Sequence, residues 1–429
     1  MSLSRREFMK WLSASAALGA NFSAIGQAGA ANAGAKGAGH VVVVGGGFAG
    51  ATVAKYIRKW GPGINVTLIE KNPQFISCPM SNLVIGGHKK MSDITISYKG
   101  LVKHGVKVVR GEVTAVDAEK KQIKLAGGKS VSYDRLVLAP GIDFMYDAIP
   151  GLNNAKAQEK ILHAWKAGAQ TVALRKQLEA MKDGGVYALH IPLAPYRCPP
   201  GPYERACQVA SYLKAHKPKS KVLILDANAD ITSKKGLFTK AWAERYPGMV
   251  EYRPNSGLVD VDVPGMALKL EVESIKADVI NVVPAQRAGK VAVDLNLNNA
   301  NKRFCNVDFL TYESTAAKNI HIIGDSIQAA PAMPKSGSMA NQQAKVCAAA
   351  VVALMGGGEV NAAPMLVNTC YSFLDASDVV HVSSVHRYDA EKKTMVTVDG
   401  SGGLSAAANS LESEYAWSWA ESIWADSLA

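Results

Sequence analysis

The chain has 429 residues, 48% of them hydrophobic and 20% charged, so it is long enough for two or three domains with apolar cores. Its formal net charge of +12 comes from basic residues that are scattered and not clustered with aromatic residues, so nucleic acid is not expected as a partner. Six cysteines are too few for a disulfide scaffold in a protein of this size, so each needs its own interpretation.

The first segment predicts export from the cytoplasm. Residues 4–10 read Ser-Arg-Arg-Glu-Phe-Met-Lys, and an apolar stretch runs from Trp11 to about Ile25 before small residues that offer cleavage points. Adjacent arginines with a nearby phenylalanine are typical of a twin-arginine signal, so residues 1–33 are interpreted as a signal peptide of a periplasmic protein. The alternative is a membrane anchor, which the short apolar stretch rich in Ala, Ser and Gly does not favour.

A glycine-rich turn opens the predicted mature chain. A strand that begins at residue 40 ends in Gly45-Gly-Gly47-Phe-Ala-Gly50, a helix follows, and a second strand ends in Glu70. This order is typical of a dinucleotide-binding unit. In such a unit Gly45 makes the tight turn, Gly47 lets the pyrophosphate approach and Gly50 lets the helix meet the strand. Glu70 is expected to bind the ribose hydroxyls.

Residues 186–226 predict a second unit of this kind with a changed turn. A strand, a helix from Tyr203 to Lys217 and a strand that ends in an acid follow one another. The turn before the helix reads Leu-Ala-Pro-Tyr-Arg-Cys198-Pro-Pro-Gly-Pro-Tyr-Glu204, with four prolines and one glycine. Proline has no N–H group to hold a pyrophosphate, so NAD(P)H is not expected to bind. The turn presents a thiol, an arginine and a carboxylate, which predicts a redox-active cysteine.

Two later segments indicate FAD. The strand and turn that end in Gly141 resemble those that close the FAD domain of two-dinucleotide-domain flavoproteins. The strand that runs into Gly324-Asp325 resembles their late Gly-Asp motif, whose acid holds the ribityl chain. Each alone is also an ordinary buried strand before a turn. Lys335 and the following helix N-terminus are expected to stabilise negative charge on a reduced flavin, and the alternative for Lys335 is a surface lysine.

Six longer motifs carry a resemblance to one family: Cys78-Pro-Met-Ser-Asn82, His163-Ala-Trp165, Arg197-Cys198-Pro-Pro-Gly-Pro-Tyr-Glu204, Met333-Pro-Lys335-Ser-Gly337, Asn368-Thr-Cys370-Tyr-Ser and Tyr415-Ala-Trp417-Ser-Trp419. Over almost the whole mature chain the sequence resembles the flavoprotein subunit of flavocytochrome c sulfide dehydrogenase. The wider superfamily includes sulfide:quinone oxidoreductases, and the glycine motifs alone do not separate the two.

The resemblance implies residue roles. Cys78 matches the cysteine that a thioether joins to the flavin 8α-methyl group, so FAD is expected to be covalent; the alternative is a buried structural cysteine. Cys198 and Cys370 match the redox-active pair of the family; the alternative is that they are two unrelated thiols. Glu204 matches an acid near the flavin that relays protons. The alternative is a carboxylate that only complements the helix dipole. Trp419 matches an aromatic residue near the flavin and the cytochrome. The alternative is an aromatic residue that only packs the C-terminal helix into a core or an interface.

The remaining cysteines, Cys207, Cys305 and Cys347, fit none of these roles and are interpreted as buried structural thiols. The motif order predicts an α/β protein with two Rossmann-like dinucleotide-binding domains, as in glutathione-reductase-like flavoproteins, plus a C-terminal α+β module. The predicted segments are a discontinuous FAD domain at 38–155 and 290–357, a second domain without nucleotide at 156–289, and a flavin-binding and interface domain at 358–429.

The implied function is oxidation of hydrosulfide to sulfur or polysulfide through a redox disulfide and FAD, with no metal. Electrons would pass to a c-type cytochrome subunit with one or two haems, because this chain has no Cys-x-x-Cys-His motif. The alternative is a sulfide:quinone oxidoreductase at the membrane surface, which needs an apolar platform that the acidic residues 405–429 match poorly. A non-catalytic electron-transfer or assembly subunit would be indicated by loss of a redox cysteine, and both are present.

Overall fold

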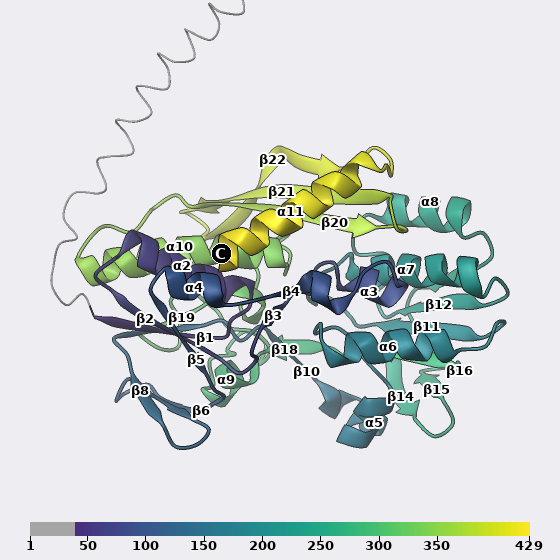
Figure 1. The fold of residues 1–429 in the computed structure, drawn as a ribbon, viewed down its shortest axis with the longest axis horizontal. Helices are drawn as coiled ribbons and strands as arrows, with labels where there is room; N and C mark the ends of the chain where they lie inside the picture. Colours follow the sequence, from purple (N-terminus) through teal and green to yellow (C-terminus); the bar gives the residue numbers. More distant parts are fainter. Residues whose placement is uncertain (1–38) are drawn as a thin grey trace, which may run out of the picture.

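The computed structural model describes residues 39–429, and the predicted signal peptide lies outside the described residues (Figure 1). One half of the molecule is built on a five-stranded parallel sheet with, in spatial order, β19 (Ile320–Ile322), β9 (Arg135–Leu138), β1 (His40–Val44), β2 (Asn65–Glu70) and β5 (Val106–Arg110). The four valines of β1 are buried because the sheet is covered on both faces, as is usual for parallel sheets.

Helices cover one face of this sheet. The long helices α2 (Phe48–Trp60) and α10 (Gly337–Gly356) pack against each other, and α4 (Lys99–Lys103) lies beside α2 (Figure 1). Below the sheet in the same view lie the elements β6 (Val113–Asp117), β7 (Gln122–Leu125), β8 (Ser130–Ser132) and α9 (Lys290–Asp294). The strands β3 (Phe75–Ile76) and β4 (Thr95–Ile96) form a two-stranded ribbon, and the connection between them contains α3 (Ser81–Gly86), which carries part of the cysteine site.

The other half repeats the parallel arrangement. Its sheet has the order β13 (Val250–Arg253), β12 (Lys221–Asp226), β11 (Val186–Ile191) and β17 (Val279–Val282). The helices of this half are α5 (Ala155–Lys160), α6 (Ala169–Ala180), α7 (Gly201–His216) and α8 (Lys235–Arg245). An antiparallel sheet of β14 (Leu258–Asp262), β15 (Ala267–Leu270) and β16 (Ser274–Lys276) completes it. The chain crosses between the halves through the antiparallel pair β10 (Ile142–Phe144) and β18 (Gln286–Ala288).

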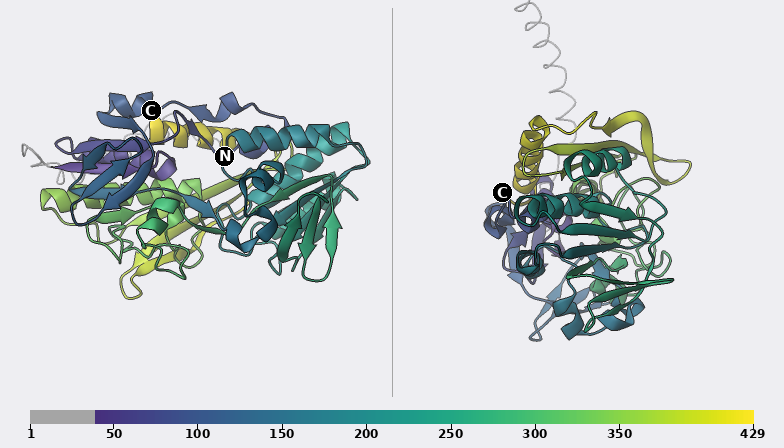
Figure 2. Two further views of the ribbon diagram at one scale, coloured as in Figure 1. Left: turned by 90° about the horizontal axis from the view of Figure 1, so that it is seen from below. Right: turned by 90° about the vertical axis from the view of Figure 1, so that its right-hand side faces the viewer.

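The C-terminal module lies across both halves (Figures 1 and 2). It consists of an antiparallel sheet, β20 (Met365–Phe373), β21 (Val379–Asp389) and β22 (Thr394–Leu404), followed by helix α11 (Leu411–Leu428). Strand β20 contacts α10 of the first half and α7 of the second, and α11 contacts α2. The module therefore brings β20 to the boundary where the two parallel sheets come together.

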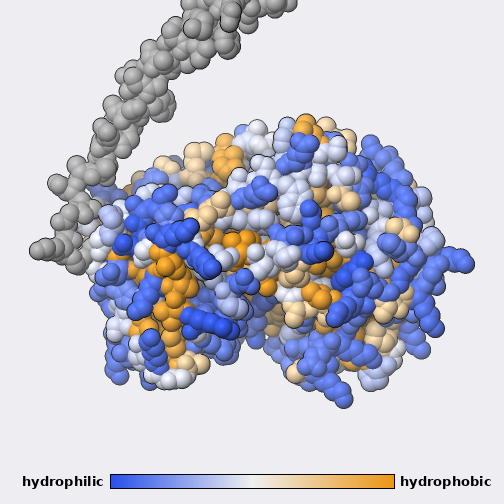
Figure 3. All heavy atoms as spheres, in the orientation of Figure 1, coloured by the Kyte–Doolittle hydropathy of each residue, from blue (hydrophilic) through white to orange (hydrophobic). Residues whose placement is uncertain are grey.

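The predicted α/β fold class is confirmed, and the main predicted elements agree with the structure within a few residues. Helix α7 begins at Gly201, two residues before the predicted start, because Pro200 precedes the helix and Pro202 fits its first turn. Within residues 39–429 no helix is both long and apolar enough to cross a membrane. Figure 3 shows a largely hydrophilic face on which apolar side chains form small separate groups.

Candidate functional site

The six cysteines fall into two groups by exposure. Cys207, Cys305 and Cys347 are completely buried, in agreement with their interpretation as structural thiols. The three cysteines with predicted roles, Cys78, Cys198 and Cys370, are only partly buried. Burial thus separates the thiols that a small reactant can reach from those that only fill the core.

Cys198 lies in the proline-rich turn between β11 and α7. Its backbone is left-handed, with φ of 60°, which is uncommon for a residue with a side chain. Its N–H donates to the carbonyl of Lys335 at 2.8 Å, and its carbonyl accepts from the N–H of Gly201 at 2.9 Å. These bonds tie the turn to the segment before α10, so the thiol has a fixed place between the two halves of the molecule.

Cys370 lies in the middle of β20, and its Sγ is 3.5 Å from Oδ1 of Asn368. Burial raises the pKa of both redox cysteines, and after burial the largest cause for Cys198 is the thiol of Cys370. Hydrogen bonds also join the segments that carry the two cysteines. The N–H of Cys198 binds the carbonyl of Lys335, and the hydroxyl of the next residue, Ser336, donates at 2.7 Å to the same Oδ1 of Asn368 that the Cys370 Sγ approaches. Both are thiols in the structure, so their disulfide stays a prediction.

Glu204 is buried beside both cysteines on the first turns of α7. Its Oε1 accepts from the N–H of Phe373 in β20 at 2.9 Å, and its Oε2 accepts from Nδ2 of Asn82 in α3 at 2.8 Å. Burial raises the pKa of this carboxyl, although both hydrogen bonds favour its charged form. Glu204 therefore does more than complement the helix dipole, because it connects three elements around the cysteine pair.

Arg205 links the predicted motifs. Its guanidinium donates to Oδ1 of Asn82 at 3.0 Å and to the carbonyls of His163 and Ala164 at 2.8 and 2.7 Å, and it lies 4.8 Å from the centre of the Trp165 ring. A fully buried guanidinium needs several acceptors, and these contacts supply them.

Cations and burial act on the Cys198 thiol in opposite directions. A nearby cation lowers the pKa of a thiol, and Arg197 acts in this direction. The pKa is nevertheless raised far above its usual range, first by burial and then by Cys370 and Glu204. Arg197 and a second cation, Lys234, oppose this rise only partly, and Arg205 is directed at carbonyl groups.

The glycine turn after β1 has the geometry that a dinucleotide requires. A Cβ atom on Gly50 would lie 1.7 Å from the carbonyl oxygen of Gly45, whose own φ is +98°, so both positions need glycine. A Cβ on Gly47 would meet no protein atom within 4 Å, which leaves open space beside the N-terminus of α2. Glu70 ends β2 next to this turn and accepts from the N–H of Gly46 at 2.6 Å.

Asp325 and Gly324 follow β19 in the short turn Gly324–Ser326. Oδ1 of Asp325 is buried and has no hydrogen-bond partner among residues 39–429. Burial raises the pKa of this carboxyl, against the nearby charges of Arg197 and Lys335. An orphaned buried carboxylate oxygen fits the hydroxyl donors of a ribityl chain, so these residues fit FAD. Gly141, with φ of +68°, faces open space on the neighbouring strand connection.

Lys335 is not a surface lysine. Its side chain is buried, donates to the carbonyls of Asp325 and Ile327, and lies 3.7 Å from the centre of the Phe304 ring. Burial lowers its pKa to about 8, and Asp325 opposes this change. The cation is therefore part of the same buried site as Asp325, where the resemblance predicts the flavin.

Cys78 and Trp419 have separate surroundings. The Cys78 Sγ accepts from the N–H of Ala167 at 3.4 Å and lies 3.9 Å from the carbonyl of Trp165, to which Arg197 also donates. The Trp419 ring on α11 lies 6.1 Å from the ring of Tyr371, next to Cys370. Trp419 is partly buried and packs against the core, so it contributes to packing. Its role near the flavin and the cytochrome stays a prediction.

Lys234 is a member of the site that the sequence analysis missed. Its ammonium is buried and donates to the carbonyl of Cys370 at 2.8 Å. In the sequence, Lys234 and Lys235 are an ordinary pair of charges before a helix. The only sequence signal is that cations are unfavourable at a helix N-terminus.

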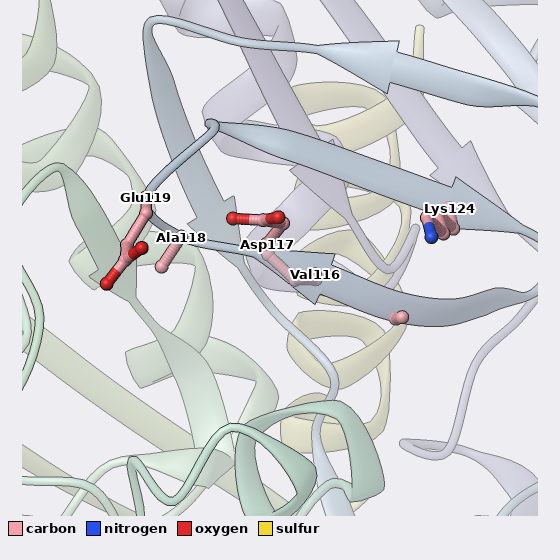
Figure 4. A pocket seen from close by; sticks show the side chains of 6 residues that line it. Val116, Asp117, Ala118, Glu119 and Lys124 are labelled. Atoms are coloured by element: carbon pink, nitrogen blue, oxygen red, sulfur yellow. The ribbon is translucent and has the colours of Figure 1, made fainter.

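A surface hollow lies away from the cysteine site. Figure 4 shows a shallow hollow on the β6–β7 hairpin, where Asp117 and Glu119 project near the turn, and its lining residues are Ala115, Val116, Asp117, Ala118, Glu119 and Lys124. It contains no predicted site residue and no buried titratable group, so it does not compete with the cysteine site.

Comparison with known families divides the chain into three parts. Residues 39–180 match the pyridine nucleotide-disulphide oxidoreductase family, 171–284 match the central part of the sulfide dehydrogenase (flavocytochrome c) flavoprotein chain, and 362–428 match the flavocytochrome c sulphide dehydrogenase flavin-binding family. The sulfide dehydrogenase flavoprotein chain of Chlorobaculum thiosulfatiphilum is 61% identical over 44 residues, which are 10% of this chain and 92% of that sequence. The chain belongs to the flavocytochrome c sulfide dehydrogenase flavoprotein family. The predicted family is confirmed.

This flavoprotein is also similar to sulfide:quinone oxidoreductases. The mitochondrial protein of Dictyostelium discoideum is 25% identical over 299 residues, 67% of this chain and 65% of that protein. The sulfide-quinone reductase of Aquifex aeolicus is 30% identical over 110 residues, 25% of this chain and 26% of that protein. The chain thus spans at most about two thirds of these relatives. The solved Aquifex aeolicus sulfide:quinone oxidoreductase has the same fold, with a TM-score of 0.72 over 92% of both chains at 19% identity.

Proposed function

We propose that this flavoprotein oxidises hydrosulfide to sulfur or polysulfide through a disulfide between Cys198 and Cys370, and that its electrons pass by way of FAD to a c-type cytochrome subunit in the periplasm. The observation that carries the proposal is that hydrogen bonds through residues 335, 336 and 368 join the segments of these two partly buried cysteines. The buried carboxyl of Glu204 binds the strand that carries Cys370. Family membership supports the flavin and the sulfide substrate.

The proposed chemistry is a thiol–disulfide exchange. Hydrosulfide attacks one sulfur of the oxidised pair, a new S–S bond forms, and the bond between the cysteines breaks. The products are one cysteine persulfide, which keeps the hydrogen of hydrosulfide, and one cysteine thiolate, so atoms and charge balance. Glu204 would take the persulfide proton in this proposal, and its raised pKa supports the role because a carboxylate with a raised pKa is a stronger base.

FAD would be held by residues of the first half. The open space at Gly47 would admit a pyrophosphate, Glu70 would bind a ribose, and the unpaired oxygen of Asp325 would accept from a ribityl hydroxyl. Cys78 is the proposed covalent attachment point, and its partial exposure supports this role over that of a core thiol. When bound, FAD supplies the conversion from two-electron oxidation of the cysteines to one-electron transfer to a haem.

The second half supports the proposal that NAD(P)H is not the reductant. Asp226 ends β12 where a dinucleotide domain has its ribose acid, yet it is fully buried. Its Oδ2 accepts from the hydroxyls of Tyr203 and Tyr252 at 2.7 and 3.1 Å. A ribose would have to displace both tyrosines, and the proline-rich turn has few N–H groups for a pyrophosphate.

The C-terminal helix supports a cytochrome over a membrane quinone as electron acceptor. Its apolar residues Ala416, Ala420 and Ile423 face inward and are buried, whereas Glu414 and Glu421 are exposed. Two other acids of this helix, Glu412 and Asp426, are held by hydrogen bonds within the protein, so they are no evidence against contact of the helix with a membrane. The exposed positions of α11 include the apolar residues Leu411 and Tyr415, but Glu414, Ser418, Glu421 and Ser422 are also exposed, so the outward face is mixed and not a continuous apolar platform.

The proposal is tested by anaerobic titration of the FAD-loaded full chain with sulfide and, separately, with NADH, following flavin absorbance. We expect bleaching by sulfide and none by NADH, and loss of the sulfide response in Cys198→Ser. Bleaching by NADH but not by sulfide would overturn the proposal.

A second assay separates the two electron acceptors. The sulfide-reduced protein is mixed with an oxidised c-type cytochrome in buffer, or with a quinone in detergent. Rapid cytochrome reduction without detergent is the expected result. Reduction of the quinone alone would favour the sulfide:quinone oxidoreductases that the chain also resembles.

A further inference from the structure

The buried ammonium of Lys234 is bound to the strand that carries Cys370. Its Nζ donates to the carbonyl of Cys370 at 2.8 Å, to Oγ of Ser372 at 2.9 Å and to the carbonyl of Val380 at 3.2 Å. These acceptors use all three ammonium protons and belong to two adjacent strands, β20 and β21. A lysine with only 4% of its surface exposed is therefore fixed in one position behind the cysteine.

The local backbone gives this lysine no structural reason to be there. Lys234 precedes α8 in a left-handed conformation, with φ of 56° and ψ of 35°. That conformation is costly for a residue with a side chain, and the positive end of the helix dipole repels a cation. Strained residues of this kind persist where the surrounding structure holds them, and they gather at functional sites.

The loop that delivers Lys234 is held by the remains of the second dinucleotide site. Asp226, at the end of β12, accepts from Tyr203, whose hydroxyl also accepts from the N–H of Thr232 at 3.1 Å. The hydroxyl of Tyr196, two residues before Cys198, lies 2.8 Å from Oγ1 of Thr232. In a dinucleotide-binding domain the segment after this strand would lie beside a ribose. Here the same segment contains Lys234, which binds the strand of Cys370.

The groups that face Lys234 are acidic. Cys370, Glu204, Cys198 and Glu412 all raise its pKa, while burial, the largest effect, lowers it to about 8. In return, Lys234 is the strongest influence that favours the thiolate of Cys370, followed by the side chains of Asn368 and Ser336. The thiolate of Cys198 is favoured first by Arg197 and only then by Lys234.

We propose that Lys234 is a positioning residue that fixes Cys370 and stabilises its thiolate when hydrosulfide opens the disulfide. In this step hydrosulfide attacks the sulfur of Cys198, which becomes a persulfide. The bond between Cys198 and Cys370 breaks, and its electron pair stays on Cys370, whose backbone carbonyl binds the ammonium. The role of Lys234 in the reaction rests on the proposed function. The effect of Lys234 on the Cys370 thiol does not depend on that function.

The test measures the pH dependence of Cys370 alkylation by iodoacetamide in full-length, FAD-loaded Cys198→Ser protein, with the Cys370 peptide quantified by mass spectrometry. Lys234→Met removes the charge and Lys234→Arg keeps it. The matched control is Lys235→Met, because Lys235 is the neighbouring lysine but is exposed and paired with Asp230. We expect Lys234→Met to raise the alkylation midpoint by about one pH unit, a roughly tenfold smaller thiolate fraction, and the other two variants to leave it unchanged.

A folding defect is separated from a charge effect by Lys234→Gln, which keeps hydrogen-bond donors toward β20 without the charge. If the methionine variant fails to fold, the glutamine variant carries the test and is expected to show the same rise. An unchanged midpoint in the neutral variant would overturn the inference. Absence of sulfide oxidation in wild type, with the midpoint shift intact, would refute the proposed function and leave the effect of Lys234 on Cys370 standing.

Discussion

The two parallel-sheet halves contain the same local succession of strand, turn, helix, strand and acid, and they use it differently. In the first half the turn is three glycines with open space at Gly47, and the acid Glu70 remains partly exposed beside it. In the second half the turn is rich in proline and carries Cys198, while the acid Asp226 is buried under tyrosine hydroxyls. Thus one topology serves cofactor binding in one half and presents a reactive thiol in the other.

The difference lies in which backbone groups remain free. A glycine turn leaves N–H groups and space for a phosphate, whereas prolines remove donors and stiffen the chain. Stiffness is useful for a thiol that must meet another thiol from a distant strand, because the geometry of a disulfide is narrow.

The largest effect is expected where the second turn carries the chemistry. Cys198→Ser should reduce sulfide-dependent flavin bleaching at least about 10³-fold, because without the Cys198 sulfur no disulfide can form for hydrosulfide to attack. Stopped-flow absorbance under anaerobic conditions measures the rate. Cys347→Ala, in the core of α10, is the control and should leave the rate unchanged. Equal rates in Cys198→Ser and wild type would mean that the proline-rich turn does not present the reactive thiol, which would contradict the comparison between the two turns.

Glu204→Gln should have the next largest effect, about 10²-fold on the sulfide-dependent rate, because general base catalysis typically contributes at least this much. Burial raises the Glu204 pKa, so the folded protein binds the proton more tightly than the unfolded chain does. This contribution to stability is largest below the ordinary carboxyl pKa and is lost as the pH rises through the folded pKa. Unfolding measured across this pH range should therefore depend less on pH in the variant; a profile identical to wild type would argue against a buried ionisable role.

Gly47→Ala tests the first turn. The added Cβ meets no protein atom, so the fold should be unaffected, but the methyl group would occupy the approach of the pyrophosphate. We expect FAD affinity to fall at least about tenfold, or about 1.4 kcal/mol, before any covalent attachment. Fluorescence titration of the apoprotein measures it. Gly236→Ala, an open position in α8 of the second half, should leave FAD binding as it is. A loss in both variants would indicate a general folding defect.

Sequence reasoning located the elements because they depend on local patterns. The buried valines of β1, the glycine turn and the helix after Cys198 are short-range signals, and all appear where they were predicted. The burial of Lys335 and Lys234 could not be predicted, because each lysine is hidden by residues that are distant in the chain. The raised pKa of Cys198 escaped prediction for the same reason: nearby arginines are visible in the sequence, but burial is not.

The smallest effects are expected from variants that remove one tyrosine hydroxyl in each half. In the second half the variant is Tyr203→Phe, which removes one hydroxyl from the closed site. Asp226 would keep the hydroxyl of Tyr252 and two donors from Asn228, so the loss should be about 1–2 kcal/mol of unfolding free energy by chemical denaturation. The comparable change in the first half is Tyr98→Phe, whose hydroxyl donates to the Gly46 carbonyl at 3.1 Å. A neutral pair costs less than a bond to a carboxylate, so this variant should lose about 1 kcal/mol or less. A larger loss from Tyr98→Phe would mean that the hydroxyls around Asp226 are dispensable, and that the second site is closed by packing alone.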